Sequence, residues 1–193
     1  MKSHEQIETK IESTLHSRRD FFKLGALALA TSLSESAFAT TWADMAPKRS
    51  LSLYNIHTGE QLNTVFWAEG IYQPDALAQI NYLLRDYRTG DILQIDTGLL
   101  DLLSALSVTL DTNAQFHVIS GYRSPATNAM LNKSSHGVAK HSLHMDGLAI
   151  DIRMPNRDLS DVHRAALALK GGGVGFYPVL DFVHVDVGRI RTW

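Results

Sequence analysis

The sequence contains no cysteine, and this absence excludes several kinds of site and scaffold at once. No disulfide can form, so stability must come from a packed core, helped by any metal that binds. Thiolate metal sites and cysteine nucleophiles are excluded for the same reason. Excess charge is also lacking: the formal net charge is −2 at pH 7, without the basic cluster that nucleic-acid binding requires. The length of 193 residues suits one domain, or one domain with a tail.

The chain also lacks an apolar run long enough to stay in a membrane. The apolar run over residues 24–33 is shorter than the roughly 20 residues of a spanning helix, and it follows the paired Arg18 and Arg19. Small residues at Ala37 and Ala39 are typical of a signal-peptidase site. We therefore predict a signal peptide over residues 1–39 of the twin-arginine (Tat) type, with an ordinary secretory signal as the alternative.

This signal predicts where the protein works and what exports it. The Tat export machinery, whose cargo crosses the membrane already folded, is the expected partner. The expected location is the periplasm or cell envelope, with no stable transmembrane helix after the signal is cleaved. Residues 40–50 are expected to form a linker, and residues 51–193 a single domain.

Hydrophobic periodicity predicts a mixture of helices and short strands in that domain. The hairpin is expected to pair residues 51–56 with 64–67 around a turn at 57–60. Helices are expected at 74–88, at 98–110 and from a capping Ser160 to Leu169. Further strands are expected at 115–119, 148–152 and 182–187, with one more short strand before the last. No βαβ regularity is present, so the predicted fold is α+β, with a small, mostly antiparallel sheet and flanking helices.

Strand alternation directs a few polar side chains away from the core. In 148–152 the apolar residues share one face, which leaves Asp151 on the other. In 182–187 the valines share one face, which leaves Phe182, His184 and Asp186 on the other. A glycine turn directs His144 off the hydrophobic face as well. His144, Asp151 and His184 therefore form a candidate set of two imidazoles and one carboxylate. Catalytic zinc typically has three such ligands plus water, whereas non-heme iron sites usually place a His-x-Asp pair before the distant histidine.

The residues around this set resemble a known family. Residues 142–151 match the pattern S-x-H-x-x-G-x-A-x-D of the LAS-type metallopeptidases, the group of D-alanyl-D-alanine carboxypeptidases and hedgehog-like domains. The resemblance continues through 120–124, 172–178 and 182–188, and the chain is most similar to the murein endopeptidases of the MepK (YcbK-like) type. It implies a hedgehog/D-Ala-D-Ala-peptidase-like fold in which His144, Asp151 and His184 bind Zn²⁺.

The resemblance also implies roles for other residues. Arg123 occupies the family's arginine position, where a guanidinium can hold a scissile carbonyl oxygen or a substrate carboxylate. The general base is expected to be Asp186 or Asp181; Asp186 is favoured, and it could alternatively hydrogen-bond a ligand imidazole. Phe182 stands where some relatives carry another histidine. Candidate substrate-binding residues beside Arg123 are Tyr122, His141 and Ser142.

The resulting hypothesis is a zinc-dependent peptidase that hydrolyses peptide crosslinks of peptidoglycan. The resemblance, rather than the composition, implies this substrate and the involvement of meso-diaminopimelate. A D,D-carboxypeptidase on the same polymer and a non-catalytic module that binds zinc or peptidoglycan are the alternatives. A non-heme iron oxygenase is the alternative of a different chemical class.

Overall fold

A computed structural model describes residues 47–134 and 138–193, so the predicted signal peptide and most of the predicted linker lie outside the described residues. The hairpin expected from the sequence is present. Strand β1 (Lys48–Asn55) pairs antiparallel with β2 (Gln61–Ala68), and a bulge lies between Arg49 and Ser50. Strand β1 begins before residue 51, at which the sequence predicts the start of the domain.

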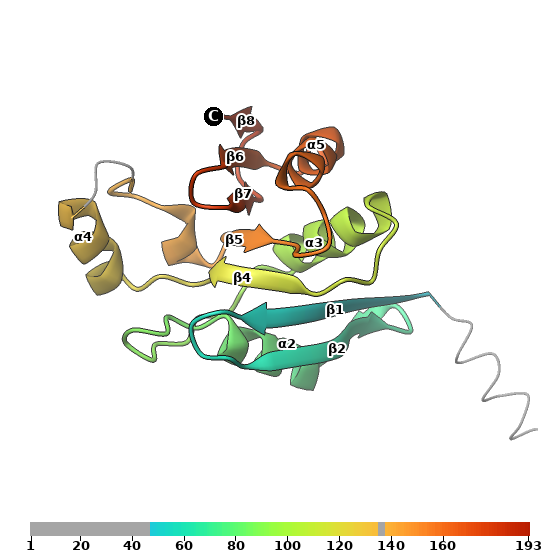
Figure 1. Cartoon of the computed structure of the whole chain (residues 1–193). Coiled ribbons are helices and arrows are strands. Elements are labelled where there is room, and N and C mark those ends of the chain that lie inside the picture. The colour runs from blue at the N-terminus through green and yellow to red at the C-terminus, as the bar shows by residue number, and fades with distance from the viewer. Residues whose placement is uncertain (1–46, 135–137) are drawn as a thin grey trace, which may run out of the picture. The chain divides into compact units, whose positions relative to one another are not determined.

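Eight strands form one sheet in the order β3-β2-β1-β4-β5-β7-β6-β8, which Figure 1 shows from bottom to top for most of its strands. The remaining strands are β3 (Ile71–Tyr72), β4 (Phe116–Ser120), β5 (Ala149–Arg153), β6 (Gly173–Tyr177), β7 (Phe182–Asp186) and β8 (Arg191–Thr192). Only the β1–β4 and β6–β8 pairs are parallel among these described strands. The prediction of an α+β fold with a mostly antiparallel sheet is confirmed, and the sheet is mixed.

The helices of the described chain are α2 (Pro74–Leu83), α3 (Thr97–Thr109), α4 (Pro125–Ser134), the 3₁₀ helix η1 (Leu143–Asp146) and α5 (Leu159–Leu169). The predicted helices are present with changed bounds, and two further helices, α4 and η1, were not expected from the sequence. Helix α2 ends before the predicted residue 88, because the buried Asp86 carboxylate accepts from the Arg88 and Ser124 amides and turns the chain. Helix α5 is preceded by Asp158 instead of Ser160. Helix α4 was not predicted from the sequence, although Ser124 before Pro125 is a helix-start signal.

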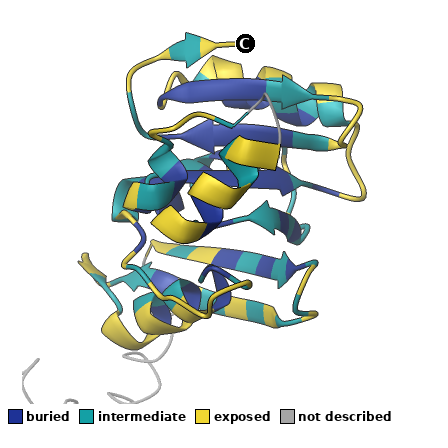
Figure 2. Cartoon of the chain, turned by 90° about the vertical axis from the view of Figure 1, so that its left-hand side faces the viewer, coloured by how far each residue is buried: buried dark blue, intermediate teal, exposed yellow. Residues whose placement is uncertain are grey.

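One hydrophobic core joins the helices to a single face of the sheet. Side chains from α2, α3 and α5 pack there with those of the central strands, and Leu53, Ile80, Leu99, Ile150 and Val183 are completely buried. Figure 2 shows that β5, β7 and much of β6 are the most buried part of the sheet. Because Ile150, Ile152, Val183 and Val185 occupy the core, alternation places Asp151 and His184 on the opposite face, as the sequence predicts.

Candidate metal centre

Three elements bring His144, Asp151 and His184 together. Asp151 and His184 are direct partners in the antiparallel β5–β7 pair, so the register itself places the two side chains side by side. His144 comes from η1, which ends at Gly147 in a left-handed conformation with φ 69°. A Cβ at Gly147 would lie 2.7 Å from the Gln94 carbonyl oxygen, so this tight connection requires glycine.

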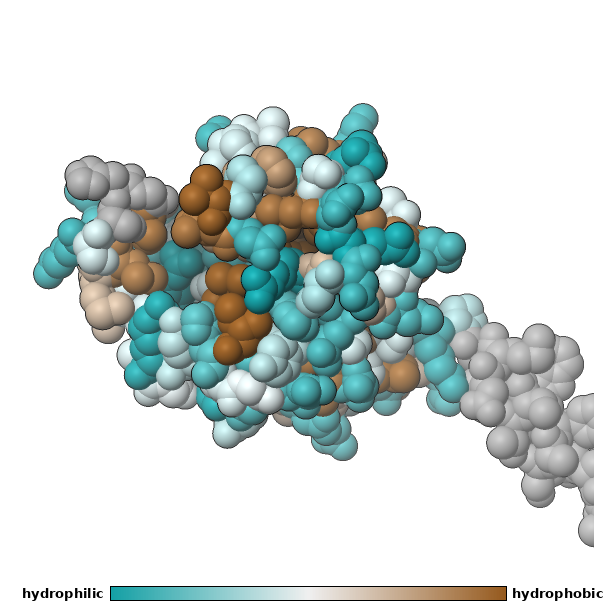
Figure 3. All heavy atoms as spheres, viewed as in Figure 1, coloured by the Kyte–Doolittle hydropathy of each residue, from teal (hydrophilic) through white to brown (hydrophobic). Residues whose placement is uncertain are grey.

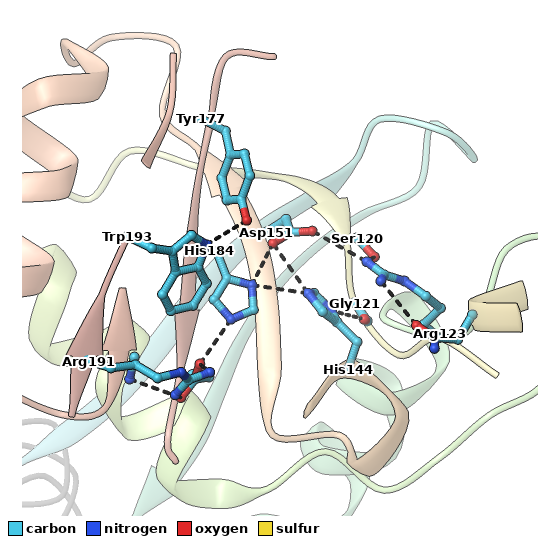
Figure 4. A network of polar contacts seen from close by, with 12 residues as sticks. Ser120, Gly121, Arg123, His144, Asp151, Tyr177, His184, Arg191 and Trp193 are labelled. Carbon is cyan, nitrogen blue, oxygen red and sulfur yellow. Dashed lines mark hydrogen bonds and ion pairs between the residues drawn. The ribbon is translucent and has the colours of Figure 1, made fainter. Parts of the chain in front are cut away.

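The three side chains converge on one point (Figure 4). His184 Nδ1 lies 2.9 Å from Asp151 Oδ1, and His144 Nε2 lies 3.2 Å from His184 Nδ1 and 3.3 Å from Asp151 Oδ1. Two bonds of about 2.0–2.1 Å at a tetrahedral angle separate their ligand atoms by roughly 3.3 Å. The observed separations are therefore close to those of three ligands on one zinc-sized ion.

The outer nitrogen of each imidazole has a partner that can only accept a hydrogen bond. His144 Nδ1 donates to the Gly121 carbonyl oxygen at 2.8 Å, and His184 Nε2 donates to Asp186 Oδ2 at 3.0 Å. In the neutral rings this leaves the lone pairs of His144 Nε2 and His184 Nδ1 directed at Asp151 Oδ1 and at each other. Three buried acceptors at such distances need a cation between them, so the donor chemistry fits a metal ion.

The charges around the triangle favour the same conclusion. Burial alone would raise the pKa of Asp151, but the His144 and His184 imidazoles outweigh burial and hold that pKa well below its usual range. Burial alone would lower the pKa of His184, but the carboxylates of Asp151 and Asp186 outweigh it and raise that pKa. The two carboxylates therefore favour positive charge at the position of His184.

Asp186 accepts a hydrogen bond from His184, and both of its carboxylate oxygens are occupied by protein donors. It is completely buried. Its Oδ1 accepts from the Gly173 and Gly188 amides, each at 2.9 Å, and from Arg191 Nη1 at 3.1 Å. Its Oδ2 accepts from His184 Nε2 and, at 2.7 Å, from Arg191 Nη2. Of the two roles open to Asp186 from the sequence, these contacts support hydrogen bonding to a ligand imidazole.

Asp181, the other candidate base, lies in the turn between β6 and β7 and faces a different part of the surface. Its side chain is 60% exposed and forms a 2.8 Å ion pair with Arg153. It lines a separate pocket with His117 and Arg157. Among the residues that the structure describes, neither candidate carboxylate lines the cavity that contains the His–Asp–His set.

That cavity has a volume of about 570 Å³ and opens beside the three ligands. Its wall contains Arg123, His141 and Ser142, together with the apolar Leu180 and Phe182. In Figure 3 apolar side chains flank a recessed hydrophilic area at the left of the view. Three of the four predicted substrate-binding residues are thus brought to one opening.

Tyr122 is the exception, because it does not line this cavity. Its amide donates to the Leu84 carbonyl oxygen at 2.8 Å, and its side chain packs against the hydrophobic core. Gly121 allows this approach, since a Cβ there would lie 2.5 Å from Leu84 O. Among the polar residues of the cavity wall, Tyr177, Arg191 and Trp193 were not predicted from the sequence. The resemblance over 172–178 includes Tyr177, whereas Arg191 and Trp193 lie beyond the ranges that carry the resemblance.

Arg123 is anchored over the set by several contacts. Its Nη2 lies 3.7 Å from Asp151 Oδ2 and 3.3 Å from Ser120 Oγ, and its Nη1 lies 3.4 Å from Asn128 Oδ1. Burial lowers the pKa of Arg123 from its ordinary value, with the nearby Asp151 carboxylate opposing that effect. Its Nε is buried and has no partner among the described residues. The guanidinium is therefore a positioned cation with a spare donor.

The site combines a buried His–Asp–His set, an anchored arginine and an adjacent cavity. This combination is that of a metal-dependent peptidase, an enzyme that hydrolyses amide bonds. The comparisons give the family. The family model Peptidase_M15_2, described as "Peptidoglycan L,D-endopeptidase MepK", matches residues 43–193, and this chain belongs to that peptidase family.

Individual relatives match over almost the same length. The chain is 41% identical over 176 residues to "Peptidoglycan L,D-endopeptidase MepK" of Escherichia coli K12, which is 91% of this chain and 96% of that protein. It is 39% identical over 177 residues to "Probable peptidoglycan L,D-endopeptidase MepK" of Haemophilus influenzae, which is 91% of this chain and 95% of that protein. No solved structure matches the chain significantly.

The contacts of Asp186 lead to a prediction that separates support from proton transfer. In Asp186→Asn the amide oxygen can still accept from Gly173 and Gly188, but the amide nitrogen then faces the donors His184 and Arg191. We expect the affinity for zinc to fall roughly 10- to 100-fold, measured by competition with a chelator. Asp181→Asn, the matched control, should keep its affinity. Unchanged affinity with a large loss of kcat in Asp186→Asn would instead identify Asp186 as the base.

Proposed function

We propose that this protein is a zinc-dependent endopeptidase that hydrolyses peptide crosslinks of peptidoglycan. The cleaved bond joins an L-configured to a D-configured centre and involves meso-diaminopimelate. The observation that carries the proposal is the triangle of His144, Asp151 and His184, whose three acceptors point at one another beside an open cavity. The printed activity of relatives that share 39–41% identity supports the choice of polymer and bond.

The proposed site divides the work among a few residues. His144, Asp151 and His184 would hold the zinc ion. When bound, zinc supplies a Lewis acid that polarises a carbonyl and lowers the pKa of water to about 7. Arg123, which lines the cavity, binds the oxygen of the scissile carbonyl, where negative charge develops during attack. Ser142 and His141 contact the peptide along the same wall.

Digestion of purified sacculi tests the function. Zinc-loaded wild-type protein is expected to convert crosslinked muropeptide dimers to monomers, as read by mass spectrometry, whereas Asp151→Ala leaves the dimers intact. Loss of terminal D-alanine with the dimers preserved would point to a D,D-carboxypeptidase. Binding of muropeptides without any turnover in zinc buffer would point to a non-catalytic module.

The proposed location is the periplasm, which the protein reaches through the Tat machinery by a signal over residues 1–39. A linker follows this signal and ends before β1 begins at Lys48. Among the residues that the structure describes, no helix has the length and apolar character to cross a bilayer. Replacing both Arg18 and Arg19 with lysine is expected to move the protein from the periplasmic to the cytoplasmic fraction on immunoblots, because paired arginines are the mark of this route. Unchanged export of that variant would indicate an ordinary secretory signal.

A further inference from the structure

The placement of Asp186 and Asp181 outside the cavity leaves open which other group acts on the reacting amide. Besides the three candidate ligands, six wall residues have side chains with exchangeable protons: Arg123, His141, Ser142, Tyr177, Arg191 and Trp193. Arg191 is held by Asp186, at 2.7 and 3.1 Å. Tyr177, at the end of β6, is the residue whose hydroxyl hydrogen has a direction set by its neighbours.

A single hydrogen bond determines that direction. Trp193 Nε1 donates to the Tyr177 hydroxyl oxygen at 2.6 Å, and an indole nitrogen can only donate. The phenol oxygen is therefore the acceptor in this pair, and its own hydrogen must point elsewhere. Tyr177 itself donates no hydrogen bond among the described residues. In Figure 4 its hydroxyl lies at the end of the ring that is directed toward Asp151 and His184.

The rings around Tyr177 hold this arrangement firmly. Tyr177 stacks on Phe182 with ring centroids 4.5 Å apart, and the Trp193 ring lies 5.2 Å from that of His184. The backbone of Trp193 is bonded to β6 through the Val174 carbonyl and the Phe176 amide. A Cβ at Gly175 would lie 2.7–2.8 Å from three atoms of the indole, so glycine is what lets the ring lie flat on β6. The indole is thus fixed between a metal ligand and the phenol.

We propose that Tyr177 is a catalytic residue that donates a hydrogen bond to the scissile carbonyl oxygen as this oxygen becomes an oxyanion. The proposal rests on the proposed amide hydrolysis and adds a second donor opposite Arg123. No proton leaves Tyr177; the bond shortens as charge develops on the oxygen. Trp193 is a positioning residue, because its N–H polarises the phenol and makes it a stronger donor.

Tyr177→Phe is expected to lower kcat about 100-fold, with little change in KM and an unchanged zinc content. Trp193→Phe, which keeps an aromatic ring and removes the N–H, should lower kcat by a smaller factor, roughly two- to tenfold. Tyr54→Phe on β1 is the matched control and should behave as wild type. A kcat for Tyr177→Phe within threefold of wild type would contradict the proposal.

A binding measurement separates this proposal from the proposed function. The probe is a phosphinic analogue of an L,D-dipeptide, whose tetrahedral anion imitates the oxyanion, and calorimetry with zinc-loaded protein measures its affinity. Tyr177→Phe should bind the probe about 100-fold more weakly than wild type, whatever polymer the protein cleaves. Equal affinities, or no binding to wild type, would overturn the role of Tyr177. Strong binding by wild type without cleavage of muropeptides would instead overturn the proposed substrate.

Discussion

Replacing His144 with alanine is expected to remove the metal and to lower amide hydrolysis by at least roughly 1,000-fold. The lone pair of His144 Nε2 is one corner of the triangle, 3.2 Å from His184 Nδ1 and 3.3 Å from Asp151 Oδ1. Two remaining protein ligands bind zinc far more weakly than three, and a catalytic metal stabilises the transition state by several kcal/mol. A loss of about 4 kcal/mol corresponds to this change in rate. Zinc per chain, measured by elemental analysis, and turnover of muropeptides check the prediction.

His57→Ala is the matched control, because His57 is an exposed histidine in the turn between β1 and β2. It should keep its zinc and its turnover. Chelation of wild-type protein followed by added zinc should restore activity, whereas the same treatment should leave His144→Ala inactive. Full zinc content in His144→Ala would show that the metal binds elsewhere.

The ligand set could be predicted from the sequence because two of its members depend on local periodicity. Alternation of apolar residues in 148–152 and 182–187 places Asp151 and His184 off the core face, and the structure has that alternation. Residues 33 apart in the chain then meet because β5 and β7 pair in register. Periodicity does not determine register, so the motif resemblance was needed to join His144 to the pair.

The different surroundings of Asp181 and Asp186 could not be predicted from their spacing to His184 in the sequence. Asp181 and Asp186 stand close to His184 in sequence, yet one ends in an exposed turn with Arg153 and the other is enclosed by Arg191 and two backbone amides. The difference depends on where the β6–β7 turn and the chain after β7 fold back, which is a matter of tertiary structure. Tyr177 was missed for the same reason, since its role depends on a contact with Trp193.

Replacing Arg123 with alanine is expected to lower kcat by roughly 100- to 1,000-fold while the metal stays bound. The guanidinium lies 3.7 Å from Asp151 Oδ2, the carboxylate oxygen turned away from the two imidazoles, and makes no direct contact with His144 or His184. The metal ligands therefore survive the change, and what is lost is a cation at the cavity wall. Arg123 lines the cavity, where a substrate oxygen can approach its guanidinium. Steady-state kinetics and zinc content check the prediction.

Arg123→Lys shows whether charge or shape matters. Lysine keeps the positive charge, but it cannot contact Ser120, Asn128 and Asp151 together and still present a donor to the substrate, because it lacks the planar fork of arginine. We therefore expect Arg123→Lys to recover less than a tenth of the lost rate. Arg164→Ala is the control, since this arginine on α5 is 74% exposed and pairs with Asp161 on the same helix. If Arg123→Ala lost zinc in proportion to its activity, the guanidinium would act by holding Asp151 in place, and the oxygen of the scissile amide would have to be bound by other donors.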